Sequence, residues 1–168
     1  MHDHRPPPRG LDPAVREHLL RIYRSARTIA VVGASGDETK PSNEIPAYLQ
    51  SQGYRIVPVN PRGGTLFGEH VYRSLDEVDV PIDVVDVFRP ADEAPGIARR
   101  AVALGAGVLW LQWGIESEEA REIAEAAGLI VVMNRCMGVM HQVVGLGPGP
   151  HSDEWRPRRG EPDLANPS

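Results

Sequence analysis

Residues 28–42 constrain the fold of this chain more than any other stretch. The apolar run at residues 28–32 ends at a turn of small residues, 33–36, a pattern that predicts a buried strand followed by a tight turn. Ser42 is the expected N-cap of the helix that comes next. A strand, a tight turn and a helix N-terminus leave backbone N–H groups free, and the helix dipole favours negative charge beside them. The stretch therefore predicts an anion site that suits nucleotide phosphates.

Composition narrows the class of protein further. A chain of 168 residues can bury a hydrophobic core as one domain, and its net charge of -5 argues against non-specific nucleic-acid binding. The single cysteine excludes an intrachain disulfide. No apolar run reaches membrane-spanning length, and the N-terminus has no signal-peptide core. We therefore expect a cytoplasmic protein with neither nucleic acid nor membrane as its partner.

Strand patterns alternate with helix patterns along the rest of the chain. Asp12 and Pro13 open a helix before the first strand, residues 92–104 form another helical pattern that ends at Gly105, and Ser117 caps a further helix. This alternation predicts βαβ units, and hence a doubly wound, parallel, five-stranded Rossmann-like α/β sheet with helices on both faces. The strands expected after the first cover residues 54–59, 82–88, 107–111 and 129–133.

The expected domain organisation is a disordered arm at 1–10, a folded domain at 11–145 and a flexible tail at 146–168. Residues 66–79 are expected to form a connection with at most a short strand and one helical turn. Pro46 is tolerated only in the first turn of a helix, so it leaves the start of the helix after Ser42 undefined.

Ligands of doubly wound sheets bind at the C-terminal ends of the strands, near the point where the strand order reverses. In this chain small or polar residues follow each apolar run, and we expect one pocket to collect them. The segments concerned are Gly33 to Ser35, Asn60 to Arg62, Phe88 to Pro90, Gln112 to Gly114 and Asn134 to Cys136.

The turn departs from the dinucleotide fingerprint. Gly33, Ser35 and Glu38 occupy the three glycine positions of G-x-G-x-x-G, so only the first of them matches. The second strand ends in Asn60-Pro61-Arg62 rather than in an acidic residue, which disfavours NAD. Arg62 suits a ribose phosphate, a group that both NADP and coenzyme A carry.

Taken together, several segments resemble the small single-domain coenzyme A-binding proteins, which are similar to the CoA-binding domain of succinyl-CoA synthetase α-subunits. The resemblance covers roughly residues 11–141. Met140 stands where the family usually has an acidic residue before His141, and Asn134 stands where aspartate is common. The segments that carry the resemblance are IAVVGAS at 29–35, GYRIVPVNP at 53–61, Leu75, DVVDVFR at 83–89, WLQWGI at 110–115 and Cys136.

The resemblance implies that coenzyme A or an acyl-CoA lies across the strand ends. Its phosphates would rest on the turn at 33–35 and on Ser42, with Lys40 and Arg62 neutralising them. Phe88, Arg89 and the segment at 112–114 would line the nucleotide or the pantetheine arm. The complete set implied is Gly33, Ala34, Ser35, Lys40, Ser42, Asn60, Pro61, Arg62, Phe88, Arg89, Gln112, Trp113, Gly114, Asn134 and Cys136.

Three functions stay open at this point. We favour binding of a small nucleotide ligand without catalysis, over an NADP-dependent oxidoreductase or a nucleotide-sensing regulatory and interaction module. The chain is too short for the ligase domain of the synthetase relatives, so we do not expect ligase activity. We expect no metal site, and both a monomer and a homodimer fit the sequence.

Cys136 and His141 raise the question of a reactive thiol. A nucleophilic cysteine needs a base within reach and a lowered pKa. Five residues of separation do not establish either, so we favour a buried, inert thiol. A mixed disulfide between Cys136 and coenzyme A is the weaker alternative.

Overall fold

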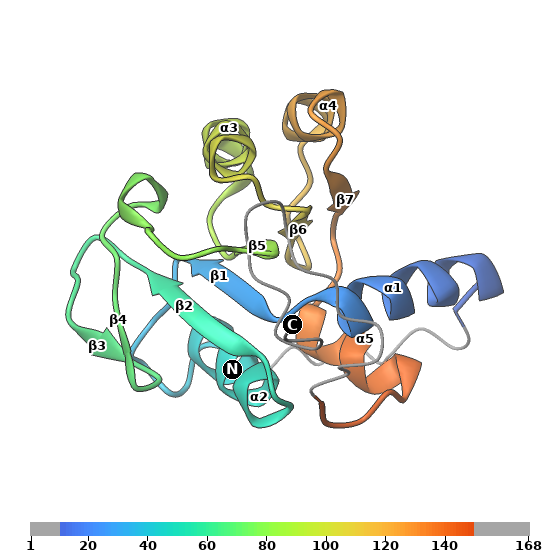
Figure 1. Cartoon of the computed structure of the whole chain (residues 1–168), viewed down its shortest axis with the longest axis horizontal. Coiled ribbons are helices and arrows are strands. Elements are labelled where there is room, and N and C mark those ends of the chain that lie inside the picture. Colours follow the sequence, from blue (N-terminus) through green and yellow to red (C-terminus); the bar gives the residue numbers. More distant parts are fainter. Residues whose placement is uncertain (1–10, 150–168) are drawn as a thin grey trace, which may run out of the picture.

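The five predicted strands form one parallel sheet in the order β2-β1-β5-β6-β7 (Figure 1). The computed structural model describes residues 11–149, so the predicted arm at 1–10 and the part of the predicted tail beyond 149 lie outside the described residues. The strand bounds are β1 Thr28–Val32, β2 Arg55–Val59, β5 Val84–Val87, β6 Val108–Leu111 and β7 Ile130–Val132. The predicted α/β fold is confirmed, with strand bounds that differ by up to two residues.

Helices cover both faces of the sheet, which makes a three-layer architecture (Figure 1). On one face lie α1 (Pro13–Ser25), α2 (Pro41–Ser51) and α5 (Met137–Val144). On the other lie α3 (Ala94–Leu104), preceded by the 3-10 turn η2 (Ala91–Glu93), and α4 (Glu118–Ala126).

The alternation of side chains along the strands divides the core into two clusters. In β1, Ile29 and Val31 pack toward α1, α2 and α5, whereas Ala30 packs toward α3 and α4. Strands buried on both faces read as continuous apolar runs, which is why the sequence predicted them well. Asp86 is the exception, because it lies fully buried in β5 beside Val31 and Trp110.

The connection between β2 and β5 contains more structure than expected. It forms a hairpin of two short strands, β3 (Thr65–Leu66) and β4 (Glu69–His70), and the single helical turn η1 (Leu75–Glu77). Between them Tyr72 runs parallel to the end of β2, since the Tyr72 N–H donates to Pro58 O at 3.0 Å and the Asn60 N–H donates to Tyr72 O at 2.8 Å. These bonds hold the residues after β4 against the end of β2.

Two expectations about α2 were wrong. Its N-cap is Lys40 rather than Ser42, because Pro41 occupies the first helical position, where its fixed φ fits and a missing N–H costs nothing. Pro46 also lies inside α2 rather than in its first turn. The Ser42 carbonyl that it leaves without an intrahelical donor accepts the Ser35 N–H at 3.3 Å, and this bond ties the turn after β1 to the helix.

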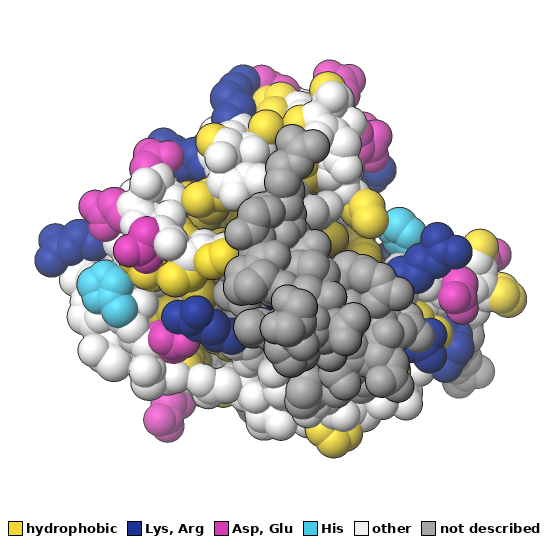
Figure 2. Space-filling model, viewed as in Figure 1, with side chains coloured by type: hydrophobic (Ala, Val, Ile, Leu, Met, Phe, Trp, Pro, Cys, Tyr) yellow, Lys and Arg dark blue, Asp and Glu magenta, His cyan; other side chains and the backbone are white. Residues whose placement is uncertain are grey.

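The outer surfaces of α3 and α4 carry basic and acidic side chains next to one another (Figure 2). Arg99 pairs with Glu119 at 3.5 Å, and Arg121 pairs with Glu118 and Glu125. Exposed pairs of this kind contribute little stability, about 0–1 kcal/mol each. Among the described residues, no helix is both long and apolar enough to cross a membrane.

Candidate functional site

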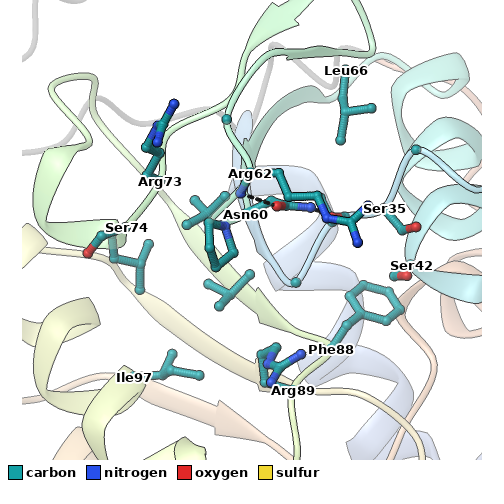
Figure 3. A pocket seen from close by; sticks show the side chains of 18 of the residues that line it. Ser35, Ser42, Asn60, Arg62, Leu66, Arg73, Ser74, Phe88, Arg89 and Ile97 are labelled. Atoms are coloured by element: carbon teal, nitrogen blue, oxygen red, sulfur yellow. Dashed lines mark hydrogen bonds between the residues drawn. The ribbon is translucent and has the colours of Figure 1, made fainter.

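A cavity of about 970 Å³ opens at the C-terminal ends of β1, β2 and β5 (Figure 3). This is where the strand order reverses, because the chain leaves β1 through α2 on one face and leaves β5 through α3 on the other. Of the residues predicted from sequence, those that line the cavity are Gly33, Ala34, Ser35, Lys40, Ser42, Asn60, Pro61, Arg62, Phe88 and Arg89.

The turn after β1 requires glycine at its first position. Gly33 has φ +90°, and a Cβ there would lie 2.9 Å from Arg89 Cδ and 3.2 Å from Phe88 O. Side chains rarely adopt this φ, and the contact with a backbone carbonyl leaves no room for a methyl group. Gly33 thus lets the ends of β1 and β5 approach closely beneath the cavity.

The backbone amides of this turn divide into two groups. The Gly33 N–H donates to Val59 O at 3.0 Å and the Ser35 N–H donates to Ser42 O, so neither is free for a ligand. Ala34 and Gly36 also line the cavity, and their N–H groups have no acceptor among residues 11–149. The sequence predicted a phosphate on the whole turn, whereas the structure leaves these two amides, with the Ser42 N–H of α2, for an anion.

The N-terminus of α2 is not capped by a side chain. Lys40, the N-cap, makes no side-chain capping bond, and it lines the cavity. Ser42 lies one position inside the first helical residue and also lines the cavity. Pro41 has no N–H and the N–H groups of Asn43 and Glu44 donate to Lys40 O, so Ser42 has the N–H that needs an external acceptor, and the helix dipole adds partial positive charge there. This helix end therefore suits a bound anion.

Asn60 holds the ends of β1 and β2 together. Its Nδ2 donates to Ala34 O at 2.6 Å, and its Oδ1 accepts the Arg62 N–H at 2.7 Å. Its carbonyl accepts the Gly63 N–H at 3.1 Å. Because an amide both donates and accepts, Asn60 fixes the turn that carries Arg62 against the turn after β1, a role that aspartate would not fill.

The charged side chains of the cavity are mostly basic, although the chain as a whole is acidic. Glu93 holds Arg89 through two hydrogen bonds of 2.7 and 3.1 Å, which raise the pKa of Arg89 and lower that of Glu93. Hydrogen bonds from Thr39 lower the pKa of Asp37. The basic residues are Lys40, Arg62, Arg73, Arg89 and Arg100, and the acidic ones are Asp37 and Glu93.

Three of these cations lack an ion-pair partner. Within residues 11–149, no carboxylate pairs with Lys40, Arg62 or Arg73. By contrast, Arg89 pairs with Glu93, and Arg100 pairs with Asp76 at 3.4 Å. Lys40 interacts electrostatically with Asp37 without forming an ion pair. Cations that lack ion pairs around one cavity favour an anionic ligand that carries more than one negative charge.

The predicted residues at the ends of β6 and β7 do not line this cavity. Gln112 is buried and donates to Asp86 Oδ1 at 2.6 Å, while Asn134 Oδ1 accepts the Gly114 N–H at 2.7 Å. Trp113 is 44% exposed. Cys136 is the buried N-cap residue of α5. These strand ends are held mainly by bonds within the protein.

Asp86 lies in β5, opposite Trp110 of β6, and its carboxyl group has an unusual environment. Its Oδ1 accepts from Gln112, whereas its Oδ2 is buried with no hydrogen-bond partner among the described residues. Burial raises the pKa of Asp86 to about 7, and the hydrogen bond from Gln112 opposes that rise. Asp86 lies outside the cavity, so its carboxyl group acts on the stability of the sheet.

Sequence reasoning missed several residues of the cavity. Arg73 and Ser74 follow the β3–β4 hairpin, in a segment read as a simple connection, and the bridge beside β2 that positions them has no sequence signature. Arg100 and Ile97 project from α3, where helical spacing predicted only an apolar face. The remaining unpredicted lining residues are Val32, Gly36, Asp37, Val59, Gly63, Leu66, Leu75 and Glu93.

Two further predictions from the sequence concern metal ligands and the thiol of Cys136. Across residues 11–149, no group of three or more His, Cys, Asp or Glu is placed to hold a metal ion. His141 Nδ1 lies 2.8 Å from the Tyr48 hydroxyl, and the two share a hydrogen bond. The reactivity of Cys136 stays a prediction.

The model of the CoA binding domain matches residues 27–142, which is more than half of the chain and includes every strand end described above. The chain belongs to the CoA binding domain family. Within this family it is 36% identical over 128 residues to the uncharacterized protein YneT of Bacillus subtilis, covering 76% of this chain and 95% of that protein.

Two further relatives of the CoA binding domain extend the comparison. The solved structure of cell-free ID.343 from Thermus thermophilus is 40% identical, with a TM-score of 0.74, covering 77% of this chain and 98% of that one. An ADP-forming acetate–CoA ligase of Methanocaldococcus jannaschii is 24% identical over 139 residues, covering 78% of this chain. The match spans 20% of that ligase, so this chain corresponds to one region of the larger enzyme.

Proposed function

We propose that this protein binds coenzyme A or an acyl-CoA in the strand-end cavity, without catalysing a reaction of its own. One observation carries the proposal: Lys40, Arg62 and Arg73 line one cavity of an acidic protein and have no carboxylate partner among the described residues. Coenzyme A supplies matching charge, because it carries a pyrophosphate and a separate ribose phosphate. Membership of the family supports the same ligand.

The pyrophosphate would lie at the N-terminus of α2. Free N–H groups of Ala34 and Gly36, the first turn of the helix and the ammonium group of Lys40 surround that position. Ser42 adds a hydroxyl group to the same wall. Charge-assisted hydrogen bonds from such donors are about twice as strong as neutral ones.

The pantetheine arm would leave the cavity past Phe88 and run along the strand ends toward β6. Phe88 lines the cavity at the end of β5, and β6 is the next strand in the sheet. Trp113, half-exposed at the end of β6, offers an apolar surface to that arm. On this route the closed ends of β6 and β7 contact the ligand without forming its phosphate site.

Isothermal titration with coenzyme A tests the proposal directly. We expect the wild type to bind, and Lys40→Ala and Arg62→Ala to weaken binding about tenfold or more, since a hydrogen bond to a charged group contributes about 1.5–3 kcal/mol. Arg99→Ala is the matched control, because Arg99 pairs with Glu119 and lies outside the cavity. A wild type without measurable affinity for coenzyme A or acetyl-CoA would contradict the proposal.

NADP is the ligand of the rival hypothesis, an oxidoreductase, and Arg62 is the observation that favours it. Competition titrations of NADPH against coenzyme A separate the two. If coenzyme A binds and NADPH does not displace it at comparable concentration, the oxidoreductase hypothesis is wrong. If NADPH displaces bound coenzyme A at a concentration lower than that of coenzyme A, NADP rather than coenzyme A would be the preferred ligand.

A further inference from the structure

Arg73 is placed at the cavity by a contact between the end of β2 and the residues after β4, and no local sequence pattern predicts this contact. The preceding residue, Tyr72, is hydrogen-bonded on both sides to the end of β2, through Pro58 O and the Asn60 N–H. Arg73 is therefore placed next to the turn at 60–63 that follows β2. Arg62 belongs to that same turn, and both arginines line the cavity beside the end of β2.

The side chain of Arg73 lies against the backbone of Gly63. A Cβ on Gly63 would lie 3.0 Å from Arg73 Nε, 3.4 Å from Nη2 and 3.5 Å from Cζ. Three atoms of the planar group at similar distances mean that the guanidinium rests over this glycine. The neighbouring Gly64 also has a positive φ, +92°, but a Cβ there would meet no atom within 4 Å. Gly63 is thus the position whose missing side chain makes room for Arg73.

Neither guanidinium is neutralised within the described part of the chain. Of two acidic residues that follow Arg73 in sequence, Glu77 accepts the backbone N–H of Arg73 through Oε2 at 3.3 Å and forms no ion pair with its guanidinium, and Asp76 pairs with Arg100. In the view of Figure 3, Asn60 and Arg62 lie between Arg73 on one side and Ser35 and Ser42 on the other. Arg62 and Arg73 are therefore basic residues that the cavity wall places beside the end of β2, whereas Lys40 lies at the end of α2.

The end of the second strand has a defined chemical meaning in doubly wound sheets. The residue there meets the adenosine ribose, where an acidic side chain binds a free hydroxyl group and arginine accommodates a phosphate. Two arginines present several N–H donors, which matches the three terminal oxygens of a phosphomonoester dianion.

We propose that Arg62 and Arg73 form a clamp for the ribose phosphomonoester of an adenine nucleotide, and that Gly63 is required so that Arg73 can lie on the turn. The clamp rests on the proposed function and adds the chemical class that the site selects. The protein would discriminate strongly between coenzyme A and dephospho-coenzyme A, which differ only in that the second lacks the ribose phosphate. Arg73 is then a specificity-determining residue, whereas the α2 end binds the part common to both ligands.

The test is the ratio of the two dissociation constants, measured by titration with coenzyme A and with dephospho-coenzyme A. We expect the wild type to prefer coenzyme A by about thirtyfold or more, because charge-assisted hydrogen bonds of this kind correspond to factors of roughly 10–150. Arg73→Met should reduce the preference about tenfold while changing dephospho-coenzyme A affinity less than threefold. The preference of Arg73→Lys should lie between those of the wild type and Arg73→Met, because an ammonium group keeps the positive charge and lacks the paired N–H donors of a guanidinium group.

Gly63→Ala and Gly64→Ala form a matched pair for the role of the glycine. Both place a side chain at positive φ, so both carry similar backbone strain, but only alanine at 63 displaces Arg73. We expect Gly63→Ala to lose several-fold of the preference for coenzyme A and Gly64→Ala to keep it. Equal losses in both variants would overturn the role of Gly63, and thermal unfolding of both variants verifies that they are folded.

The remaining outcomes separate this inference from the proposed function. If the wild type binds both ligands equally, or if Arg73→Met leaves the ratio unchanged, the clamp is wrong and coenzyme A binding stands. If the wild type binds neither ligand, both proposals are wrong. NADP and NAD form a second pair, because NADP has a ribose phosphomonoester without pantetheine; a shared preference for NADP indicates a general ribose-phosphate clamp.

Discussion

The strand ends of this sheet form two halves that look alike in sequence and differ in structure. The open half comprises the ends of β1, β2 and β5, which surround a cavity where Lys40, Arg62 and Arg73 form no ion pair with any carboxylate of residues 11–149. The closed half comprises the ends of β6 and β7, where Gln112 bonds Asp86, Asn134 bonds the Gly114 N–H and Trp110 Nε1 donates to Arg135 O at 2.8 Å. In both halves polar or small residues follow an apolar run.

Of the helices that follow these strand ends, α2 and α4 show the same contrast at their N-termini, whereas Cys136, the N-cap of α5 in the closed half, makes no side-chain capping bond. Ser117 caps α4 in the closed half, since its Oγ accepts the Ala120 N–H at 3.1 Å. Lys40 leaves the N-terminus of α2 uncapped in the open half. Polar groups that follow a strand can thus form hydrogen bonds within the protein or remain available to a ligand. Only the partners seen in the structure distinguish these two cases. The following predictions test that difference.

The largest expected effect is the pH dependence that Asp86 imposes on the closed half. Its pKa of about 7 in the folded protein exceeds the ordinary value of 3.8, so the folded state binds the proton more tightly. The free energy of unfolding therefore falls by about 4 kcal/mol in total as the pH rises from about 4 to 7. Above that range this contribution no longer changes with pH. Asp86→Asn should remove this dependence, and should be the more stable protein at pH 8.

Urea unfolding of the wild type and of Asp86→Asn between pH 5 and 8 measures the effect. The difference between the two proteins cancels the contribution of all other carboxylates. A difference that stays constant with pH would show that Asp86 is ionised throughout, and that the closed half neutralises it in some other way.

Two asparagines provide the next test, one in each half. Asn60→Ala and Asn134→Ala each remove hydrogen bonds to the backbone, and should each lower the free energy of unfolding by about 1–2 kcal/mol. Asn60→Ala should also weaken coenzyme A binding about tenfold, because it loosens the turn that carries Arg62. Asn134→Ala should leave affinity within about twofold. Equal effects on affinity would remove the distinction between the halves.

Removing the serine cap of α4 and adding a serine cap to α2 should each have a smaller effect on stability. Ser117→Ala should destabilise the protein by about 1 kcal/mol without changing affinity for coenzyme A. Lys40→Ser should instead stabilise it by about 0.5–1 kcal/mol, because the serine hydroxyl can accept the Ser42 N–H, which has no acceptor among residues 11–149, and should weaken coenzyme A binding. Denaturant unfolding and titration on the same samples measure both quantities. A Lys40→Ser variant that binds as tightly as the wild type would exclude the α2 end as the pyrophosphate site.

Trp113 is the test with the smallest expected effect. Trp113→Ala should weaken coenzyme A binding about threefold, since it removes an exposed apolar surface from the path of the pantetheine arm. It should not change the affinity for adenosine 3′,5′-bisphosphate, which lacks that arm. If both ligands lose affinity equally, Trp113 acts on the nucleotide end; if neither does, the arm does not pass over β6.

The predicted strands and most helix ends agree with the structure because each depends on neighbours in sequence. The apolar run at β1, the Asp12 and Ser117 caps and the left-handed C-cap at Gly105 are all local signals. Ser42 shows how such a signal fails, since Pro41 starts the helix two residues earlier than the serine suggested. Pro46 was misjudged for a different reason, because the turn after β1 supplies the donor that its ring removes from the helix.

The sequence by itself determined the layered α/β fold, the strand ends at which a cavity was to be expected and the first arginine that lines that cavity. Apolar periodicity, glycine and proline encode these features, and they act over a few residues. Only the tertiary structure decided that Arg73 joins Arg62, that Gln112 and Asn134 turn to partners within the protein, and that Asp86 is buried beside Trp110. Each of these outcomes depends on contacts between distant segments, which the order of residues along the chain does not specify locally.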